Sequence, residues 1–350
     1  MSRQAGSAFG DESQSLAGNH AKPHARPATE FIRSLLQIAA ILGVAAAIAG
    51  FWGHTNWILD LLSQLRVQWA IGLSVLILLF ALARSWPWVL LCVIGFAINA
   101  IPIWPYAAGL VGSRETSSVT AADSNDASKA QLRLMSLNVL TRNRNWDGVI
   151  ESVLESSPDF LVLMEIDSVW QQICETQLAQ DYPYAIYKSR EDNFGIAFLS
   201  KVPFSQSEVF ESRTLELPSI DVTFSNLGQT PLRIIATHPI PPMDQQRWAA
   251  RNEQLANVAA RFDDSTNNVM VGDFNLTPWS PCFKKAFAGT DLQDASETFG
   301  LTPTWHVFPT WIGGLKIDHA LISNKVIARR LEIGQDVGSD HLALILDFGF

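Results

Sequence analysis

Three long apolar segments near the N-terminal end of the chain constrain its fold more than any other feature. They cover residues 35–52, 67–83 and 86–104, and none of them contains Asp, Glu, Lys or Arg. Each is about as long as a helix must be to cross a hydrocarbon layer of about 30 Å. Tryptophans gather near the segment ends, where membrane proteins carry interfacial aromatic residues: Trp52, Trp57, Trp69, Trp86, Trp88 and Trp104.

We predict three transmembrane helices at these segments, within a membrane region at 31–108. Two spans are the alternative, if Arg84 and Pro87 only kink one long re-entrant segment. A buried soluble hairpin is a third interpretation. A cleaved signal peptide is disfavoured because two further apolar segments follow the first.

Positive charge near the spans predicts their orientation. Lys22, Arg26 and Arg33 precede the first span and Arg84 lies between the second and third, so all four fall on one side in a three-span arrangement. Arg66 falls on the other side. Because positive residues favour the cytoplasmic side, we predict that the N-terminus is cytoplasmic and that the long C-terminal region is extracytoplasmic. The protein would be multi-pass, in the cytoplasmic membrane if the source is bacterial.

Outside the membrane region the chain divides by composition. Residues 1–30 are polar and predicted to be disordered, and residues 109–130 are rich in Ser, Thr, Ala and Asp, typical of a flexible linker. Residues 131–350 have the mixed pattern of one soluble domain. Cys174 and Cys282 lie in that domain, and we interpret them as ordinary buried thiols, although spacing leaves a disulfide open.

Short apolar strands outnumber helices in the soluble domain. Strands are predicted at 132–140, 160–166, 194–200, 219–227, 232–240, 268–274, 317–323 and 342–350, and helices at 145–159, 244–262 and 281–287. Helices do not alternate regularly with strands, as a doubly wound sheet requires. The pattern therefore favours a two-sheet sandwich with helices packed outside.

Polar residues interrupt or follow most of these strands. One such residue is usually a turn or a helix cap. Strand ends in a layered sheet can converge on one ligand, however, and several candidates occur together. They are Asn138, Glu165, His238, Asp273, Asn275, Asp318, His319, Asp340 and His341.

The segments that carry these residues resemble the endonuclease/exonuclease/phosphatase superfamily. In chain order they read "LMSLNV", "PDFLVLMEI", "GIAFLSK", "IATH", "VGDFN", "IDHALIS" and "GSDHLAL", and the resemblance covers essentially all of 131–350. It implies an α/β fold, a four-layer α/β/β/α sandwich, and metal-dependent hydrolysis of phosphate esters.

The resemblance also implies a metal site. Glu165 is expected to be the main carboxylate ligand, with Asn138 and Asp340 in the same set. Hard oxygen ligands suit Mg²⁺ or Mn²⁺. Whether one or two ions bind is left open.

Catalytic roles follow from the same resemblance. Asp273 is expected to orient or deprotonate the attacking water, and Asn275 to bind phosphate oxygens from the same face of an extended chain. His341 is expected to form a His–Asp dyad with Asp340.

Two further motifs complete the expected site. His238 is expected to stabilise negative charge on the phosphate. Asp318 matches the acid of the "ID" motif. His319 lies where family members vary.

The charge of the soluble domain limits the classes of substrate that it is expected to bind. Residues 131–350 carry 17 Lys and Arg against 27 Asp and Glu and show no basic stripe, so duplex DNA is an unlikely partner. A lipid or lipid-linked phosphodiester is favoured, with nucleotides, sugar phosphates and extracytoplasmic nucleic acid as alternatives. Loop aromatics are candidate lipid contacts or loop packing: Trp279, Trp305, Phe308 and Trp311. An inactive binding protein on the same fold is the competing class, and the oligomeric state is unknown.

Overall fold

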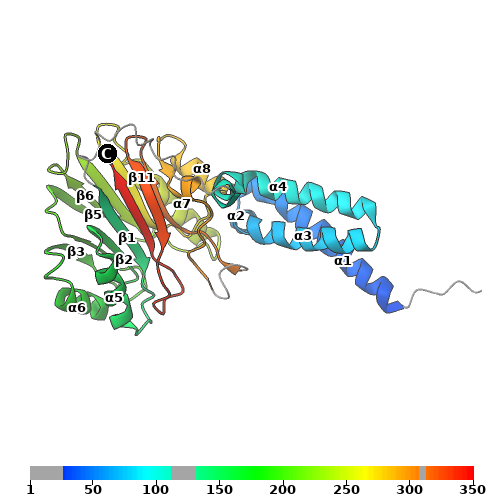
Figure 1. Cartoon of the computed structure of the whole chain (residues 1–350), viewed down its shortest axis with the longest axis horizontal. Coiled ribbons are helices and arrows are strands. Elements are labelled where there is room, and N and C mark those ends of the chain that lie inside the picture. The colour runs from blue at the N-terminus through cyan, green and yellow to red at the C-terminus, as the bar shows by residue number, and fades with distance from the viewer. Residues whose placement is uncertain (1–26, 112–130, 307–312) are drawn as a thin grey trace, which may run out of the picture.

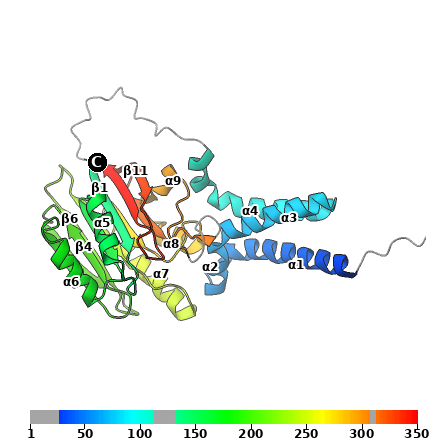
Figure 2. The same cartoon turned by 60° about the horizontal axis from the view of Figure 1, so that its bottom comes forward.

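The computed structural model describes residues 27–111, 131–306 and 313–350. It consists of a bundle of apolar helices joined to a two-sheet domain, and the bundle projects from one side of that domain (Figures 1 and 2). The bundle contains α1 (Pro27–Ala49), the short 3-10 helix η1 (Gly50–Trp52), α2 (Trp57–Gln64), α3 (Arg66–Leu82) and α4 (Trp86–Val111). We call these elements the helical region.

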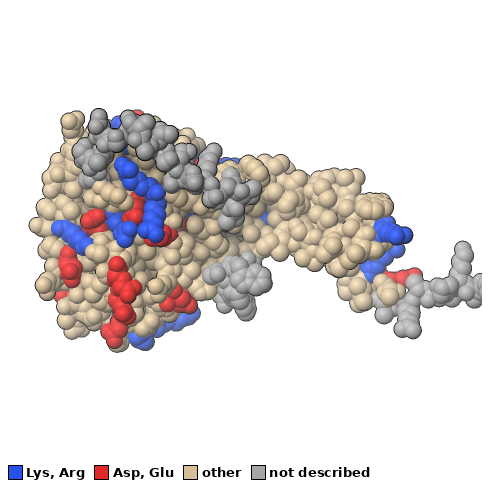
Figure 3. Space-filling model, in the orientation of Figure 1, with Lys and Arg blue, Asp and Glu red and all other residues tan. Residues whose placement is uncertain are grey.

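The helical region is apolar on its outside as well as its inside. Buried side chains of α1, α3 and α4 join the helices, among them Val44, Leu73, Phe80 and Cys92. Leu42, Leu82 and other large apolar side chains point outward and are exposed. Figure 3 shows no Lys, Arg, Asp or Glu along most of the visible length of the helical region, with charges at its far end. Such an apolar surface is typical of helices that face lipid.

Two helices are long and apolar enough to cross a membrane: residues 29–52 and residues 86–107. The helix pair α2 and α3 bends by 61° at its break and counts as a third candidate only if the pair forms one span. The predicted three spans are therefore supported for two segments. Two boundaries were wrong: α1 begins at Pro27, inside the predicted tail, and α4 continues to Val111, inside the predicted linker. The rest of that tail and linker lies outside the described residues.

The domain contains two six-stranded sheets. The first has the order β11-β12-β1-β2-β4-β3, and the second has the order β5-β6-β7-β8-β10-β9. The strands of the first sheet are β1 (Leu132–Asn138), β2 (Phe160–Met164), β3 (Tyr184–Lys188), β4 (Ile196–Ser200), β11 (Ile327–Ile333) and β12 (Leu344–Gly349). Those of the second are β5 (Gln206–Glu211), β6 (Pro218–Phe224), β7 (Leu232–Thr237), β8 (Asn267–Asp273), β9 (Gln293–Asp294) and β10 (Asp318–Ile322).

Helices cover the outer face of each sheet. The first sheet packs on α5 (Trp146–Ser156) and α6 (Ser168–Gln177), and the second packs on α7 (Gln245–Ala259) and α8 (Pro281–Phe287). A third apolar core lies between the sheets. The layers are thus helix, sheet, sheet and helix, which confirms the predicted fold class. A one-turn helix, α9 (Ser296–Phe299), contacts α4.

Strand register brings the predicted polar residues to one edge of the sandwich. The parallel pair β1 and β2 aligns Asn138 with Met164, so Glu165 follows directly beside Asn138. In the second sheet Asp318 pairs with Asp273. The Asp273 N–H donates to Met164 Sδ at 3.1 Å, which connects the two sheets at this edge.

Two glycines allow the backbone to pass closely at the same edge. Gly272 has φ +143°, and a Cβ there would lie 1.9 Å from the Thr237 carbonyl oxygen. A Cβ on Gly195 would lie 1.9 Å from the Ile166 carbonyl oxygen. Glycine is therefore required at both positions, and these contacts fix the backbone next to His238 and Glu165.

All three cysteines, Cys92, Cys174 and Cys282, are buried free thiols. This confirms the interpretation that Cys174 and Cys282 are ordinary buried thiols. Cys282 lies on α8, where its thiol is 3.5 Å from the Gly53 carbonyl oxygen of the helical region.

Candidate active site

Asp273 lies at the centre of the polar cluster, at the end of β8. It is 1% exposed, and its Oδ2 atom is 3.5 Å from His238 Nε2 and 3.5 Å from His341 Nε2. Burial raises the pKa of Asp273, but the two imidazoles outweigh this effect, so the net direction is down. The structure thus holds an ionised carboxylate between two histidines.

His341 pairs with Asp318 and not with Asp340. His341 Nδ1 is 2.9 Å from Asp318 Oδ2, and both residues are buried. The carboxylate of Asp340 instead accepts a hydrogen bond from Trp305 Nε1 at 3.2 Å. The predicted His341–Asp340 dyad was therefore wrong. The neighbouring acid in the sequence points elsewhere, because Asp340 lies in the bend at residues 338–340, which directs its carboxylate toward Trp305.

The acids around His341 keep it protonated. Burial alone would lower its pKa, but the charges of Asp318 and Asp273 and the hydrogen bond that Nδ1 donates to Asp318 raise the pKa to about 10. Asp340 adds a smaller effect in the same direction. His341 is thus a cation at neutral pH and can donate a proton from Nε2 toward the site.

Glu165 and Asn138 form a second group at the same edge. Asn138 Nδ2 donates to Glu165 Oε1 at 2.9 Å and to Asp273 Oδ2 at 3.3 Å, so the two groups are adjacent. Glu165 has φ +62°, a left-handed conformation that turns the chain as β2 ends. Thr141, which the sequence analysis did not include, fixes this turn: its hydroxyl donates to the Glu165 carbonyl at 2.8 Å.

Asn275 does not follow Asp273 on an extended chain. Its φ is +49°, and its backbone N–H donates to Asp273 Oδ1 at 2.8 Å, which makes a tight turn. Its side-chain amide donates to the Pro239 carbonyl at 2.9 Å and approaches Asp273 Oδ2 at 3.4 Å. The predicted alternation was therefore wrong, although both side chains still meet at the site.

The donors at this edge fit a divalent cation. Asn138 Oδ1 accepts only one hydrogen bond among the described residues, from Leu140 N–H, and Glu165 presents a partly exposed carboxylate. Ligand atoms of Asp273, Asp318 and His341 also lie within 4.8 Å of one another. Glu165 and Asn138 offer oxygen atoms, which are the ligands that Mg²⁺ and Mn²⁺ prefer.

His319 lies in a separate buried cluster. Its Nδ1 is 2.6 Å from Asp294 Oδ2 and its Nε2 is 2.7 Å from the Leu276 carbonyl oxygen. Lys316 Nζ joins Asp294 at 2.8 Å, and all three side chains are buried. No motif in the sequence marks Asp294, which lies in the two-residue strand β9, or Lys316, which precedes β10.

The loop aromatics have different positions. Trp279 is 3% exposed, and its Nε1 donates to the Gln64 carbonyl of the helical region at 3.1 Å. It therefore packs between the two parts of the chain and offers no free ring. Trp305 bridges to Leu315 and to His341 along the backbone. Phe308 and Trp311 lie outside the described residues.

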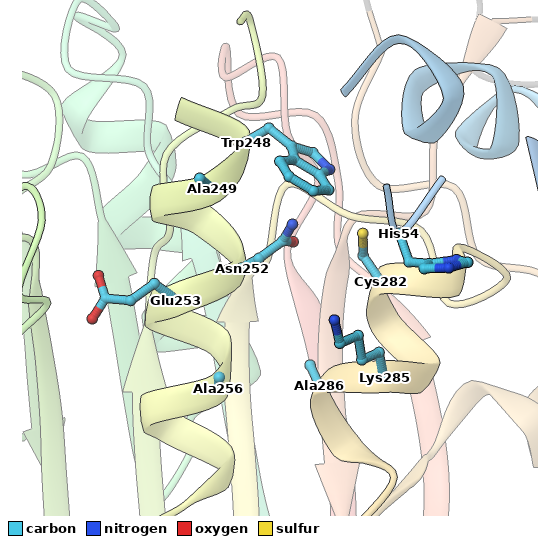
Figure 4. A pocket seen from close by; sticks show the side chains of 9 residues that line it. All are labelled: His54, Trp248, Ala249, Asn252, Glu253, Ala256, Cys282, Lys285 and Ala286. Atoms are coloured by element: carbon cyan, nitrogen blue, oxygen red, sulfur yellow. The ribbon is translucent and has the colours of Figure 1, made fainter. Parts of the chain in front are cut away.

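A cavity of about 380 Å³ lies between α7, α8 and the turn after η1. Trp248 and Asn252 from α7, Cys282 and Lys285 from α8, and His54 of the helical region line it (Figure 4). None of the predicted site residues lines this cavity. The cavity is thus a feature of the junction between the helical region and the domain, separate from the Asp273 cluster.

The chain belongs to the endonuclease/exonuclease/phosphatase family. The model of this family matches residues 135–341, more than half of the 350 residues. This range includes every predicted site residue. No curated protein matched the sequence.

Solved structures share the domain fold. A humanized D. rerio TDP2 with 14 mutations is 19% identical, covers 63% of this chain and 99% of its own, and has a TM-score of 0.53. A 3'-5' exonuclease from Neisseria meningitidis is 16% identical, with coverage of 63% and 100% and a TM-score of 0.52. The human Nocturnin catalytic domain with bound sulfate is 18% identical, with coverage of 63% and 97% and a TM-score of 0.50. At these identities the similarity establishes the fold alone.

Proposed function

We propose that the chain is a membrane-anchored phosphoesterase that uses a divalent metal, Mg²⁺ or Mn²⁺, to hydrolyse a phosphodiester or phosphomonoester with water. The observation that carries the proposal is the position of Asp273 between His238 and His341, 3.5 Å from each imidazole. An ionised acid beside a cationic, carboxylate-supported histidine provides both a base and an acid for one displacement at phosphorus.

In the proposed reaction Asp273 accepts a proton from a water molecule as its oxygen bonds to phosphorus. The ester P–O bond breaks, and His341 transfers its Nε2 proton to the leaving oxygen. Asp318 holds the imidazole and favours its charged form, at 2.9 Å from Nδ1. His238 interacts with the negative charge on the phosphate oxygens. The products are an alcohol and a phosphate monoester, or inorganic phosphate from a monoester.

Glu165 and Asn138 would hold the divalent ion, which supplies positive charge for the phosphate oxygens. Family members generally use divalent metals, and the donor set described above fits such an ion. Asp340 stays in the proposed ligand set beside this pair, and its carboxylate accepts a hydrogen bond from Trp305. Asn275 orients Asp273 through the turn described above, and its amide keeps the expected role of binding phosphate oxygens.

The helical region supports the membrane anchor and its orientation. Gly53, at the end of the first span, contacts the domain through Cys282, so the start of α1 with Arg33 lies at the far end. Arg84 follows α3, whose first turn contacts the domain through Gln68. Arg66 is 1% exposed and approaches the carbonyl oxygens of Ala47 and Ile98 at 3.5 Å, so it adds no surface charge on the domain side. The exposed positive charges thus favour an extracytoplasmic domain.

Membrane anchoring also favours a phosphate ester in or near the bilayer as substrate. The acidic balance of the domain opposes tight binding to duplex DNA. Single-stranded DNA product is bound by one relative of the same fold, D. rerio TDP2. An extracytoplasmic nucleic acid is therefore the second candidate substrate.

Hydrolysis by the purified full-length protein tests this function. We expect turnover of a bis-aryl phosphodiester with Mg²⁺ or Mn²⁺, and a decrease in kcat of about 100-fold or more for Asp273→Asn and His341→Gln. Glu151→Gln, an exposed carboxylate on α5, is the control and should retain wild-type kcat. No turnover with any divalent metal would instead support the inactive binding protein. A panel of sphingomyelin, phosphatidylinositol phosphates, DNA, RNA and nucleotides then identifies the substrate class.

A further inference from the structure

A buried ion pair joins the helical region to the domain. Asp60 of α2 and Arg251 of α7 are both 0% exposed, and Arg251 Nη2 is 2.7 Å from Asp60 Oδ2. Well-packed apolar residues at such a position are often as stabilising as a buried ion pair. The pair therefore calls for a reason beyond holding two parts of the chain together.

The ion pair leads directly to the candidate site. Arg251 Nη1 donates to the carbonyl oxygen of Asn275 at 3.3 Å, and the N–H of Asn275 donates to Asp273 Oδ1 at 2.8 Å. One chain of contacts thus runs from Asp60 through Arg251 and Asn275 to Asp273. The Nε and Nη2 atoms of Arg251 also donate to Asn252 Oδ1, which fixes the plane of the guanidinium group.

The C-terminal end of the loop that follows Asp273 also contacts α2 directly. Ser280 Oγ donates to Asp60 Oδ1 at 2.6 Å, and Trp279 Nε1 donates to the Gln64 carbonyl at 3.1 Å. Asp60 therefore holds both ends of the segment 275–280, one through Arg251 and one directly. Asn275 is left-handed, with φ +49°, a conformation that needs support from its surroundings.

A second segment near the site also contacts the helical region. Gln68 Nε2 of α3 donates to the Gly314 carbonyl at 3.1 Å. Residues 313–316 lead into β10 and Asp318, and Leu315 pairs with Trp305, which bridges to His341. The segments beside both Asp273 and His341 thus rest on α2 and α3.

We propose that Asp60 is a positioning residue for hydrolysis, so that the helical region forms part of the active site and is more than an anchor. Asp60 acts through Arg251 and the turn at Asn275 to keep the Asp273 carboxylate aligned. The proposal depends on the proposed function. It implies that the state of the helical region, and so of the surrounding bilayer, sets the turnover rate.

The test compares Asp60→Asn with the wild type in the full-length protein, on a bis-aryl phosphodiester. Asn keeps the size of Asp but removes the charge that holds Arg251. We expect kcat to fall about 10- to 100-fold with KM within about twofold, because a small misplacement of the catalytic group has this effect. Amide hydrogen exchange across 274–280 should become faster.

Tyr106→Phe is the matched control. Tyr106 also bridges the helical region and the domain, by a hydrogen bond of 3.0 Å to Glu297. Its ring packs on Trp279, and phenylalanine keeps this packing while removing only the hydroxyl, whose hydrogen bond goes to Glu297 and not to Asp60 or Arg251. This variant should keep wild-type kcat. An equal loss in both variants would overturn the proposal, because it would show a general loss of docking. Wild-type kcat in folded Asp60→Asn would also overturn it.

If Asp60→Asn fails to fold, the variant Arg251→Lys is measured in its place. Lysine keeps a positive charge opposite Asp60 but lacks the second nitrogen, Nη1, that donates to the Asn275 carbonyl. We expect a similar loss of kcat with KM retained, and wild-type kcat would overturn the proposal. An inactive wild-type protein has a different meaning, because that result contradicts the proposed function itself.

Discussion

At the scale of single residues, the identity of the acid that supports His341 decides the pH dependence of the site. Asp318 makes the hydrogen bond to Nδ1, and Asp340, the sequence neighbour, does not. The motif "GSDH" predicts a dyad between His341 and Asp340 that the bend at residues 338–340 does not form. Glu165 and Asn138, by contrast, lie side by side, with 2.9 Å between Asn138 Nδ2 and Glu165 Oε1, as residues at the same end of two adjacent parallel strands should.

We expect Asp318→Asn to change the alkaline side of the pH profile. The pKa of His341 is raised to about 10, so the charged form needed for proton donation is present below that pH and is lost above it. Removing the Asp318 charge lowers this pKa, by about 1–3 units for a contacting acid. The alkaline decline in kcat/KM should move to lower pH by a similar amount. A decline at the same pH in wild type and variant would contradict the assignment.

Gly272 provides a residue-scale test of the backbone. Gly272→Ala places a Cβ 1.9 Å from the Thr237 carbonyl oxygen at φ +143°, so we expect a loss of about 3 kcal/mol or more in the free energy of unfolding. Gly289→Ala is the control, since nothing lies within 4 Å of its added Cβ. Urea unfolding followed by fluorescence measures both. Equal stability of the two variants would show that the close approach is not required.

At the scale of elements, the buried strands and the helices α5, α7 and α8 could be predicted from the sequence, whereas helix α6 and the edge strands could not. The continuous apolar pattern of "FLVLM" predicts β2, and the helix at Pro281–Phe287 was predicted with its observed limits. Strands β3, β5, β9 and β11 were missed. They are edge or near-edge strands with largely exposed or half-buried side chains, so no apolar periodicity marks them.

Helix α2 was also missed, because the face that it packs against the domain is polar. Its residues Asp60, Ser63 and Gln64 are buried although they are polar. Polar residues on a short helix predict an exposed surface when the sequence is considered alone. Only the contacts with Arg251, Ser280 and Trp279 show why they are buried.

Trp279→Phe tests the packing of α2 on the domain. In the wild type the Trp279 ring packs beside Tyr106, at 6.0 Å between centroids, and its Nε1 donates to the Gln64 carbonyl. Phenylalanine keeps an aromatic ring beside Tyr106 but leaves the Gln64 carbonyl without this donor. Leaving a buried carbonyl without a partner costs about 1–3 kcal/mol, so we expect a lower Tm. Trp86→Phe, at a 64% exposed tryptophan of α4, should leave Tm unchanged. Thermal unfolding in one detergent compares them, and equal Tm values would contradict this packing.

At the scale of the whole molecule, the helical region and the two-sheet domain form one unit, because they share buried contacts. Two of the three predicted spans meet the length and hydropathy needed to cross a membrane. The way in which the helical region supports the site could not be predicted, because Asp60 and Arg251 are 191 residues apart in the chain.

The orientation of the whole molecule can be tested with reporters fused after Phe350. A reporter that is active only outside the cytoplasm should be active, because the exposed positive charges lie at the end of the helical region far from the domain. A reporter that works only in the cytoplasm should be silent. The reverse result would place the catalytic domain in the cytoplasm.

The most direct test of the central claim, a metal-dependent phosphoesterase site at one edge of the sandwich, is a Mn²⁺ titration of the full-length protein. Bound Mn²⁺ and phosphodiester hydrolysis are measured in the same samples, for the wild type and for Glu165→Gln. We predict that hydrolysis of the wild type saturates together with Mn²⁺ binding. We also predict that Glu165→Gln weakens both by about 10- to 100-fold. Full hydrolysis by Glu165→Gln with unchanged Mn²⁺ binding would contradict the account.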